Sequence, residues 1–411
     1  MDYKVGIIKV KNRQELKEAT SSIVNILGGM EKVIKPGDMV VIKPNVLCGR
    51  PAETGATVCP EIVEALVELA YKSKASQVII AEAANMGIDT MWAFEICGYP
   101  TVAKKTGVKL VDLKKDVQVK VKLSGRMHDY IELPKTILDA DVVINVPVLK
   151  THNQTKVSIS LKNVCVGVCT DNEKRRVIHS IGLFQPLPDE LFGKGSGLDY
   201  MISDVSAILP TDFVIVDGFY GMQGMGAPIK GEPVGAKILI AGTNRVAVDA
   251  ISCLAMSIDP YEIPHIKLAY ARGLGEIDPQ KIEVIGTPVE EIKKKFKSSL
   301  ITDLSPMLPD NVELICKNAC YSCISNFGYF LSEHSDSLKK LGPLTVIIGK
   351  TKIEDIPTDK RILLYYGNCA GEQMYGGSFV PGCVPRSRRQ VFLALGIPDE
   401  YKSFEGLKND Q

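Results

Sequence analysis

Short apolar runs recur along the first 290 residues, and segments with helical spacing of apolar positions separate most of them. Runs rich in valine and isoleucine, bounded by polar or turn residues, are typical of parallel strands buried on both faces. Apolar positions three and four residues apart predict helices between them. The pattern predicts strands at 4–10, 39–42, 78–81, 142–144, 213–216 and 237–241, and helices at 13–27, 62–71, 91–97, 200–209 and from 244.

This alternation of strand and helix predicts an α/β fold with a mostly parallel sheet covered by helices. The first domain spans residues 1–290. After a linker expected to be helical at 290–297, two further buried strands at 344–349 and 361–366 predict a smaller cysteine-rich α/β unit spanning 300–411. Because the chain has 411 residues, more than one packed unit is expected.

Composition narrows the class of protein. Hydrophobic residues make up 45% of the chain and charged residues 24%, as in soluble globular proteins. The net charge of +1 gives no basis for a nucleic-acid partner. The N-terminal sequence MDYKVGIIKV is unlike a signal peptide, and no apolar run reaches the roughly 18 residues of a membrane span. We expect a cytoplasmic protein with no membrane partner.

The stretch from Asp141 to Gly167 carries the strongest candidate for a small-molecule site. It begins as a buried strand, and four polar groups follow within it. Lys43 and Asn45 follow an earlier strand in the same way. Because open α/β sheets bind ligands beyond the carboxyl ends of their strands, these side chains predict a cleft for a small anionic molecule. A solvated loop followed by a helix start is the alternative. The four groups are Lys150, His152, Lys162 and Asn163.

The eleven cysteines fall into two groups. Six are scattered among apolar or small neighbours, which favours buried and unreactive thiols. The other five lie in the last quarter of the chain, where three form a C-x₃-C-x₂-C motif and two follow in glycine-flanked loops. Four thiolates can hold a 4Fe–4S cluster, and three leave one iron open to substrate. The alternatives are a zinc site and thiols that bind no metal. The five candidate ligands are Cys316, Cys320, Cys323, Cys369 and Cys383.

Either of the two late cysteines, Cys369 or Cys383, is a candidate for the fourth ligand. Cys383 is favoured because Pro381 and Pro385 stiffen its loop, and Cys369 is then expected to line the site. The motif also suggests radical S-adenosylmethionine chemistry. That interpretation is disfavoured because Ser322 stands where that class has an aromatic residue and because the motif lies late in the chain.

Several motifs in order resemble the family called domain of unknown function 362. They are VINVPVLKTH, SLKN, VDGFYGMQGMGAPIKGEPV, AGTNRVAVDAISCLAM and IPHIKLAYARGLG, and the resemblance covers about residues 41–286. Members commonly carry ferredoxin-like cysteine motifs, which implies iron–sulfur binding. This chain departs from fused members because it has no tandem ferredoxin repeat. The resemblance implies site roles for Lys43, Asn45, Lys150, His152, Lys162, Asn163, Asp217 and Asp249.

Two functional classes follow. In the first, the protein is an enzyme, an iron–sulfur oxidoreductase or a hydro-lyase. Lysines would bind a carboxylate or phosphate substrate, and Lys150 and His152 would be the catalytic groups. In the second, the protein is an electron carrier or accessory protein with a structural cluster and a redox partner protein. Three cluster ligands favour the first class, and four favour the second.

Overall fold

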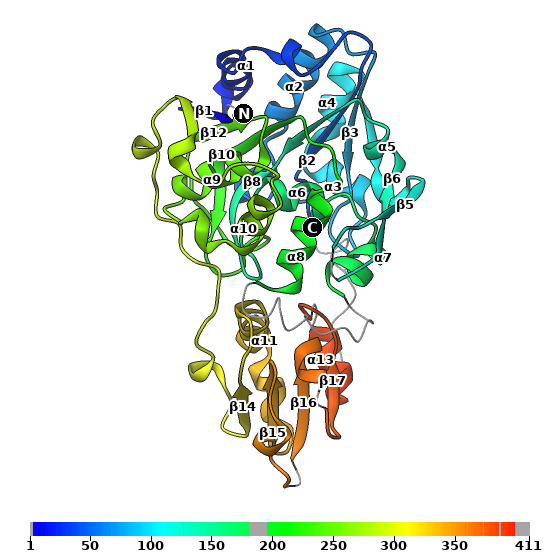
Figure 1. Ribbon diagram of the computed structural model, residues 1–411, viewed down its shortest axis with the longest axis vertical. Helices are drawn as coiled ribbons and strands as arrows, with labels where there is room; N and C mark the ends of the chain where they lie inside the picture. The colour runs from blue at the N-terminus through cyan, green and yellow to red at the C-terminus, as the bar shows by residue number, and fades with distance from the viewer. Residues whose placement is uncertain are drawn as a thin grey trace. The chain divides into compact units, whose positions relative to one another are not determined.

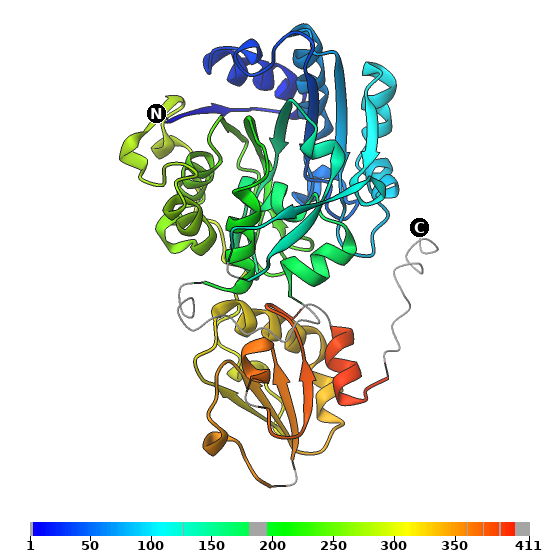
Figure 2. The same cartoon turned by 45° about the vertical axis from the view of Figure 1, so that its right-hand side comes forward.

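The computed structural model describes residues 3–125, 127–180, 195–359, 361–372, 374–385 and 388–398. The chain divides into two compact units (Figures 1 and 2). Unit 1 takes the chain up to His152, then Lys156–Glu173 and Ile202–Ser299. Unit 2 takes Asn153–Thr155, the described parts of 174–201, and the chain from Leu300.

A mixed but mostly parallel sheet forms the centre of unit 1. Its strands stand in the order β13 (Ile282–Gly286), β1 (Tyr3–Lys9), β12 (Ile238–Gly242), β10 (Phe213–Gln223), β7 (Val142–Val146), β2 (Met39–Pro44), β3 (Gln77–Glu82) and β4 (Lys109–Asp112). The predicted α/β class is confirmed. Only β12 runs antiparallel to both neighbours along this order.

Smaller strands extend unit 1. β8 (Val148–His152) pairs with β10 and with β9 (Lys156–Ser158), and β11 (Glu232–Pro233) pairs with β10. A separate hairpin of β5 (Gln118–Lys122) and β6 (Tyr130–Pro134) was not expected from the apolar pattern.

Helices cover the sheet of unit 1 in layers (Figures 1 and 2). Alternate strand residues such as Val40 and Ile42 belong to one apolar core with helices α1 and α2, while Val41, pointing the other way, is also fully buried. A strand buried on both faces explains the continuous valine and isoleucine runs. The helices are α1 (Leu16–Ile26), α2 (Pro60–Lys72), α3 (Thr90–Ile96), α4 (Tyr99–Thr106), α5 (Lys135–Leu138), α6 (Ser160–Val166), α7 (Asp171–Glu173), α9 (Arg245–Ala255) and α10 (Pro264–Ala271).

Unit 2 is built on a parallel sheet whose strands stand in chain order: β14 (Val312–Cys316), β15 (Leu344–Ile348), β16 (Ile362–Tyr366) and β17 (Ser378–Val380). Its helices are α11 (Tyr321–Lys339), α12 (Asn368–Gly371) and α13 (Arg388–Leu395), and α8 (Gly197–Ser206) begins in this unit. Both predicted strands of the C-terminal unit are therefore present.

Two details differ from the sequence-based expectations. The linker at 290–297 is not helical, since only a 3₁₀ turn at Val289–Glu291 precedes extended chain. The stretch 171–197, rich in glycine, proline and charge, suggests an excursion over the first sheet, but its described residues 174–180 and 195–197 belong to unit 2. Across the described residues, no helix combines the length and the apolar character that crossing a membrane would require.

Candidate functional site

Four of the five late cysteines line one cavity in unit 2. Cys320 precedes α11 and Cys323 lies in its first turn, while Cys369 lies in α12 and Cys383 follows β17. These loops meet because they leave the carboxyl ends of parallel strands, which share one edge of the sheet. The remaining lining comes from Gly195, Ser196, Gly197, Asn318, Ala319, Gly349, Tyr366, Gly367, Asn368 and Gly382.

Glycines bring backbone close to the thiols. Gly367 has a φ of 92°, and a Cβ added there would stand 3.1 Å from the Cys323 Sγ. Gly382 has a φ of 136°, and a Cβ there would stand 2.7 Å from the Cα of Pro385. Both positions need glycine for conformation and for space. In iron–sulfur proteins in general, main-chain amides near the cysteines donate hydrogen bonds to the cluster sulfurs.

The start of α11 distinguishes its two thiols. A hydrogen bond from the Cys323 thiol, helped by the backbone amides of Ser322 and Cys323, lowers the pKa of Cys320 in spite of burial. The same hydrogen bond and burial raise the pKa of Cys323. Burial also raises the pKa of Cys383, which the backbone amide of Gly197 opposes. Cys320 therefore ionises more readily than Cys323 and Cys383.

Cys316 is not part of the cavity lining, although its neighbour Cys320 adds to the rise that burial causes in the pKa of Cys316. It is the last residue of β14, its side chain is exposed, and it does not line the cavity. The structure thus brings together Cys320, Cys323, Cys369 and Cys383 and leaves out the first cysteine of the motif. Within the described residues, no three cysteine, histidine or acidic side chains are already arranged around a position for a single metal ion.

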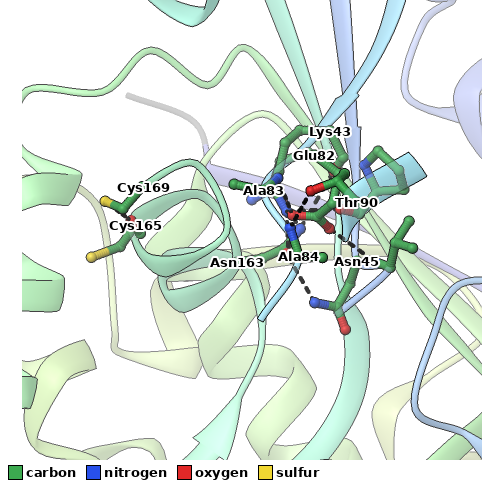
Figure 3. Close-up of polar contacts among 12 residues, drawn as sticks. Lys43, Asn45, Glu82, Ala83, Ala84, Thr90, Asn163, Cys165 and Cys169 are labelled. Carbon is green, nitrogen blue, oxygen red and sulfur yellow. Dashed lines mark hydrogen bonds and ion pairs between the residues drawn. The ribbon is translucent and has the colours of Figure 1, made fainter. Parts of the chain in front are cut away.

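Unit 1 contains the second candidate site, a network of buried polar groups at the carboxyl ends of β2, β3 and β7 (Figure 3). The ammonium of Lys43, fully buried, lies 2.9 Å from Glu82 Oε1 and donates to the carbonyl of Pro44 at 2.8 Å. Glu82, 1% exposed, also accepts from the backbone amides of Val46 and Ala83 at 2.8 Å. The positive charge of Lys43 is therefore balanced by the Glu82 carboxylate inside the protein.

Asn163 connects the network to its neighbours. Its Oδ1 accepts from Lys43 Nζ and from Asn45 Nδ2, each at 3.1 Å, and its Nδ2 donates to Asn145 Oδ1 at 2.8 Å. Lys150 Nζ donates to Asn45 Oδ1 at 2.5 Å. Lys43, Asn45, Lys150 and Asn163, predicted to share a cleft, are thus joined through hydrogen bonds.

Lys150 differs from Lys43 in its surroundings. It also donates to the carbonyl of Ala56 at 2.7 Å, and among the described residues it forms no ion pair with a carboxylate. Burial lowers its pKa to about 8. Burial also lowers the pKa of Lys43, although Glu82 opposes the shift. Lys150 is the network amine that can change charge near neutral pH.

The other predicted unit 1 residues are buried. His152 lies in the β8–β9 hairpin, and Lys162 precedes Asn163 in α6. Asp217 accepts from the backbone amides of Cys59, before α2, at 2.7 Å and of Phe219 at 2.9 Å.

Asp249 accepts from the amides of Ser160 and Leu161 at 2.9 and 3.0 Å, which caps the start of α6. Both aspartates thus use their carboxylates to hold helix starts.

The scattered cysteines are mostly buried, as expected, and Cys48 is partly exposed. Burial raises the pKa of Cys165, whose carbonyl accepts from the Cys169 thiol at 3.2 Å (Figure 3). Burial likewise raises the pKa of Cys97 to about 12. These values favour the protonated thiol at neutral pH.

Several residues that contribute to the two candidate sites were not predicted from the sequence. Asn145 lies inside a valine-rich strand and Gly167 follows α6, where a Cβ would stand 2.3 Å from Lys43 Nζ. A polar residue within an apolar strand is a signal that could have found Asn145. Ser196 and Gly197 could not have been found, because they are distant in sequence from the late cysteines.

Comparison with known proteins places the chain in a family. A thylakoid-associated protein of Synechocystis sp., sll1697, is 24% identical over 276 residues, which cover 67% of this chain and 81% of that protein. The lactate racemase apoprotein of Thermoanaerobacterium thermosaccharolyticum is 12% identical, with 87% of this chain and 71% of that chain covered. Its TM-score of 0.37 is too low to carry an argument. The family described as Domain of unknown function (DUF362) matches residues 40–254, more than half of the chain, so the chain belongs to that family.

Proposed function

We propose that this protein binds a 4Fe–4S cluster in unit 2 and serves electron transfer. The observation that carries the proposal is the presence of four thiols, those of Cys320, Cys323, Cys369 and Cys383, on one glycine-lined cavity. Four thiolates are the usual complement of such a cluster. When bound, the cluster supplies one-electron transfer at a potential set by charge, hydrogen bonds and solvent exposure.

The residues around the cavity suit this role. Cys320, whose pKa is lowered, is better prepared than Cys323 or Cys383 to enter as a thiolate. Gly367 lets main chain approach the Cys323 sulfur, where amides can stabilise negative charge. A zinc ion would need its thiolates to converge on one point at about 2.3 Å. Zinc stays the alternative metal, and metal analysis of the purified protein decides between zinc and the cluster.

The ligand set leads to a discriminating experiment. Anaerobically purified protein should contain iron and sulfide, with an electron paramagnetic resonance signal after reduction. Replacing Cys320, Cys323, Cys369 or Cys383 singly with serine should remove or convert the cluster. Cys316→Ser should keep it because Cys316 lies outside the cavity, and Cys48→Ser is the control in unit 1. Loss of iron in Cys316→Ser but not in Cys369→Ser would contradict this ligand set. Tightly bound zinc without iron would contradict the cluster.

A second candidate function is catalysis on a small anionic molecule. The observation that favours it is Lys150, which is 1% exposed and donates to two neutral oxygens. An ammonium without a carboxylate partner can attract a carboxylate or phosphate once a substrate reaches it. His152, at the end of β8, would then supply or accept a proton.

Calorimetric titration with inorganic phosphate tests this candidate. Binding that disappears in Lys150→Met and persists in Lys297→Met, an exposed unit 1 lysine, would support it. Equal affinity in both variants would reject a role for Lys150. The main proposal also includes a cytoplasmic location, because reducing conditions there keep thiols available to iron. It further includes a redox partner protein that exchanges electrons with the cluster.

A further inference from the structure

Asn368 ties the two late cysteine loops to each other. The backbone amide of Gly382 donates to Asn368 Oδ1 at 2.7 Å, and the backbone amide of Asn368 donates to the carbonyl of Gly382 at 3.1 Å. Cys369 directly follows Asn368, and Cys383 directly follows Gly382. This reciprocal pair of hydrogen bonds therefore fixes the separation of two thiol-bearing backbones.

The same loops are held by main chain from residues 179 and 180. Asn368 Nδ2 donates to the carbonyl of Ser180 at 3.3 Å, and the amide of Cys383 donates to the carbonyl of His179 at 2.8 Å. Both acceptors are backbone carbonyls of a segment nearly two hundred positions earlier in the chain. Asn368 is 2% exposed, so these hydrogen bonds are made away from solvent.

The two pairs of thiols are positioned by different means. Cys320 and Cys323 share the first turn of α11, so the helix itself sets their spacing. Cys369 lies in the short helix α12 and Cys383 in the loop after β17, so no single helix or strand spans them. Their relative position depends on long-range hydrogen bonds, several of which meet at Asn368.

We propose that Asn368 is the positioning residue for the Cys369 and Cys383 half of the cluster site. Through its side-chain amide, it also ties that half to the carbonyl of Ser180. The inference rests on the proposed cluster function for its purpose, but the positioning itself exists without metal. Removing the side chain should therefore loosen two thiols and leave the other two unchanged.

Alkylation of the metal-free protein tests the positioning directly. The rates at which iodoacetamide modifies individual cysteines are measured by mass spectrometry after iron has been removed with a chelator. In Asn368→Leu, buried partners lose their hydrogen bonds, and Cys369 and Cys383 should react about tenfold faster. Cys320 and Cys323 should react at the wild-type rate.

Two further variants guard against a general folding defect. Asn368→Asp keeps the acceptor for Gly382 and loses the donor to Ser180, so its acceleration should be smaller. Asn311→Asp is the matched control, because Asn311 Nδ2 donates to the carbonyls of Leu338 and Leu341 in the same unit, outside the cavity. Equal acceleration at all four thiols, or none in either Asn368 variant, overturns the inference.

A measurement on the iron-loaded protein separates this inference from the proposed function. Asn368→Leu should lose iron to a chelator faster than wild type and show altered electron paramagnetic resonance g values, while Asn311→Asp should match wild type. A wild-type protein without iron overturns the cluster, and the alkylation rates still decide the positioning. A wild-type cluster with unchanged iron loss and spectrum in Asn368→Leu overturns only the coupling to Asn368.

Discussion

The buried polar network of unit 1 and the thiol cavity of unit 2 lie at equivalent places, the carboxyl ends of parallel strands, yet they differ in how their groups are satisfied. In the network, Lys43, Glu82 and Asn163 bind one another and nearby main chain. In the cavity, four thiols face a common space. Polar groups that complete one another mainly stabilise a fold, whereas converging groups around a space are suited to bind something else.

The largest expected change in stability comes from breaking the buried ion pair between Lys43 and Glu82. Lys43→Met leaves the Glu82 carboxylate buried without its cation, which should lower the free energy of unfolding of unit 1 by about 3–5 kcal/mol. Urea denaturation followed by the fluorescence of Trp92, the single tryptophan, measures this change. The double variant Lys43→Met/Glu82→Gln should recover most of the loss.

The matched control is Lys297→Met, which breaks an exposed pair with Glu232 and should leave stability nearly unchanged. An Lys43→Met protein as stable as this control would mean that the pair is not a stabilising element of unit 1.

The next effect is the pH dependence contributed by Lys150. Its folded-state pKa of about 8 lies below that of an unfolded lysine, so between pH 8 and pH 10 the unfolded chain binds more protons. The free energy of unfolding should therefore rise with pH in this window, by about 3 kcal/mol relative to Lys150→Met. Below pH 8 both states carry the charge, and the cost of burying it is fully present.

Urea denaturation of both proteins at several pH values between 7 and 10 measures this difference, and the contribution of Lys43 cancels because both proteins contain it. Parallel pH profiles would show that Lys150 keeps an ordinary pKa in the folded protein.

A smaller effect concerns glycine in the thiol cavity. Gly367→Ala and Gly376→Ala place a side chain at similar positive φ values of 92° and 70°, but only the Cβ at 367 approaches Cys323. Both should lose roughly 1–3 kcal/mol through backbone strain, and Gly367→Ala should lie toward the upper end because the ψ of 154° at Gly367 places it in a region that is essentially restricted to glycine. Gly367→Ala should also lose about 1 kcal/mol more through crowding, and should retain less iron.

Hydrogen exchange of α11 amides and iron analysis measure these losses. Identical behaviour of the two variants would show that the space beside Cys323 is not needed for the cavity.

The apolar pattern predicted most of the fold because burial on both faces demands continuous β-branched strands. It could not predict the antiparallel direction of β12, since direction depends on which strands become neighbours. It also missed the β5–β6 hairpin, in which Lys120 and Lys122 interrupt the apolar residues. Alternation over so few residues is a weak signal.

For the candidate sites, sequence spacing was informative within one element and less informative across the boundary of an element. The motif grouped Cys316 with Cys320 and Cys323, but Cys316 ends a strand and its side chain is exposed. Cys369 and Cys383 could be chosen as candidates from their glycine-rich loops, whereas their partner Asn368 depends on contacts across the fold. Long-range hydrogen bonds leave no spacing pattern in the sequence.

Unit 2 is assembled from segments that are far apart in the sequence, and this limits how it could be transferred between proteins. Its cavity wall includes Gly195, Ser196 and Gly197, and its cysteine loops bind the carbonyls of residues 179 and 180, all encoded inside the region that matches the family. A gene fragment starting at residue 300 would therefore encode an incomplete cavity. The C-terminal unit therefore cannot be transferred to another protein by itself. Recombination would have to move residues 179, 180 and 195–197 together with it.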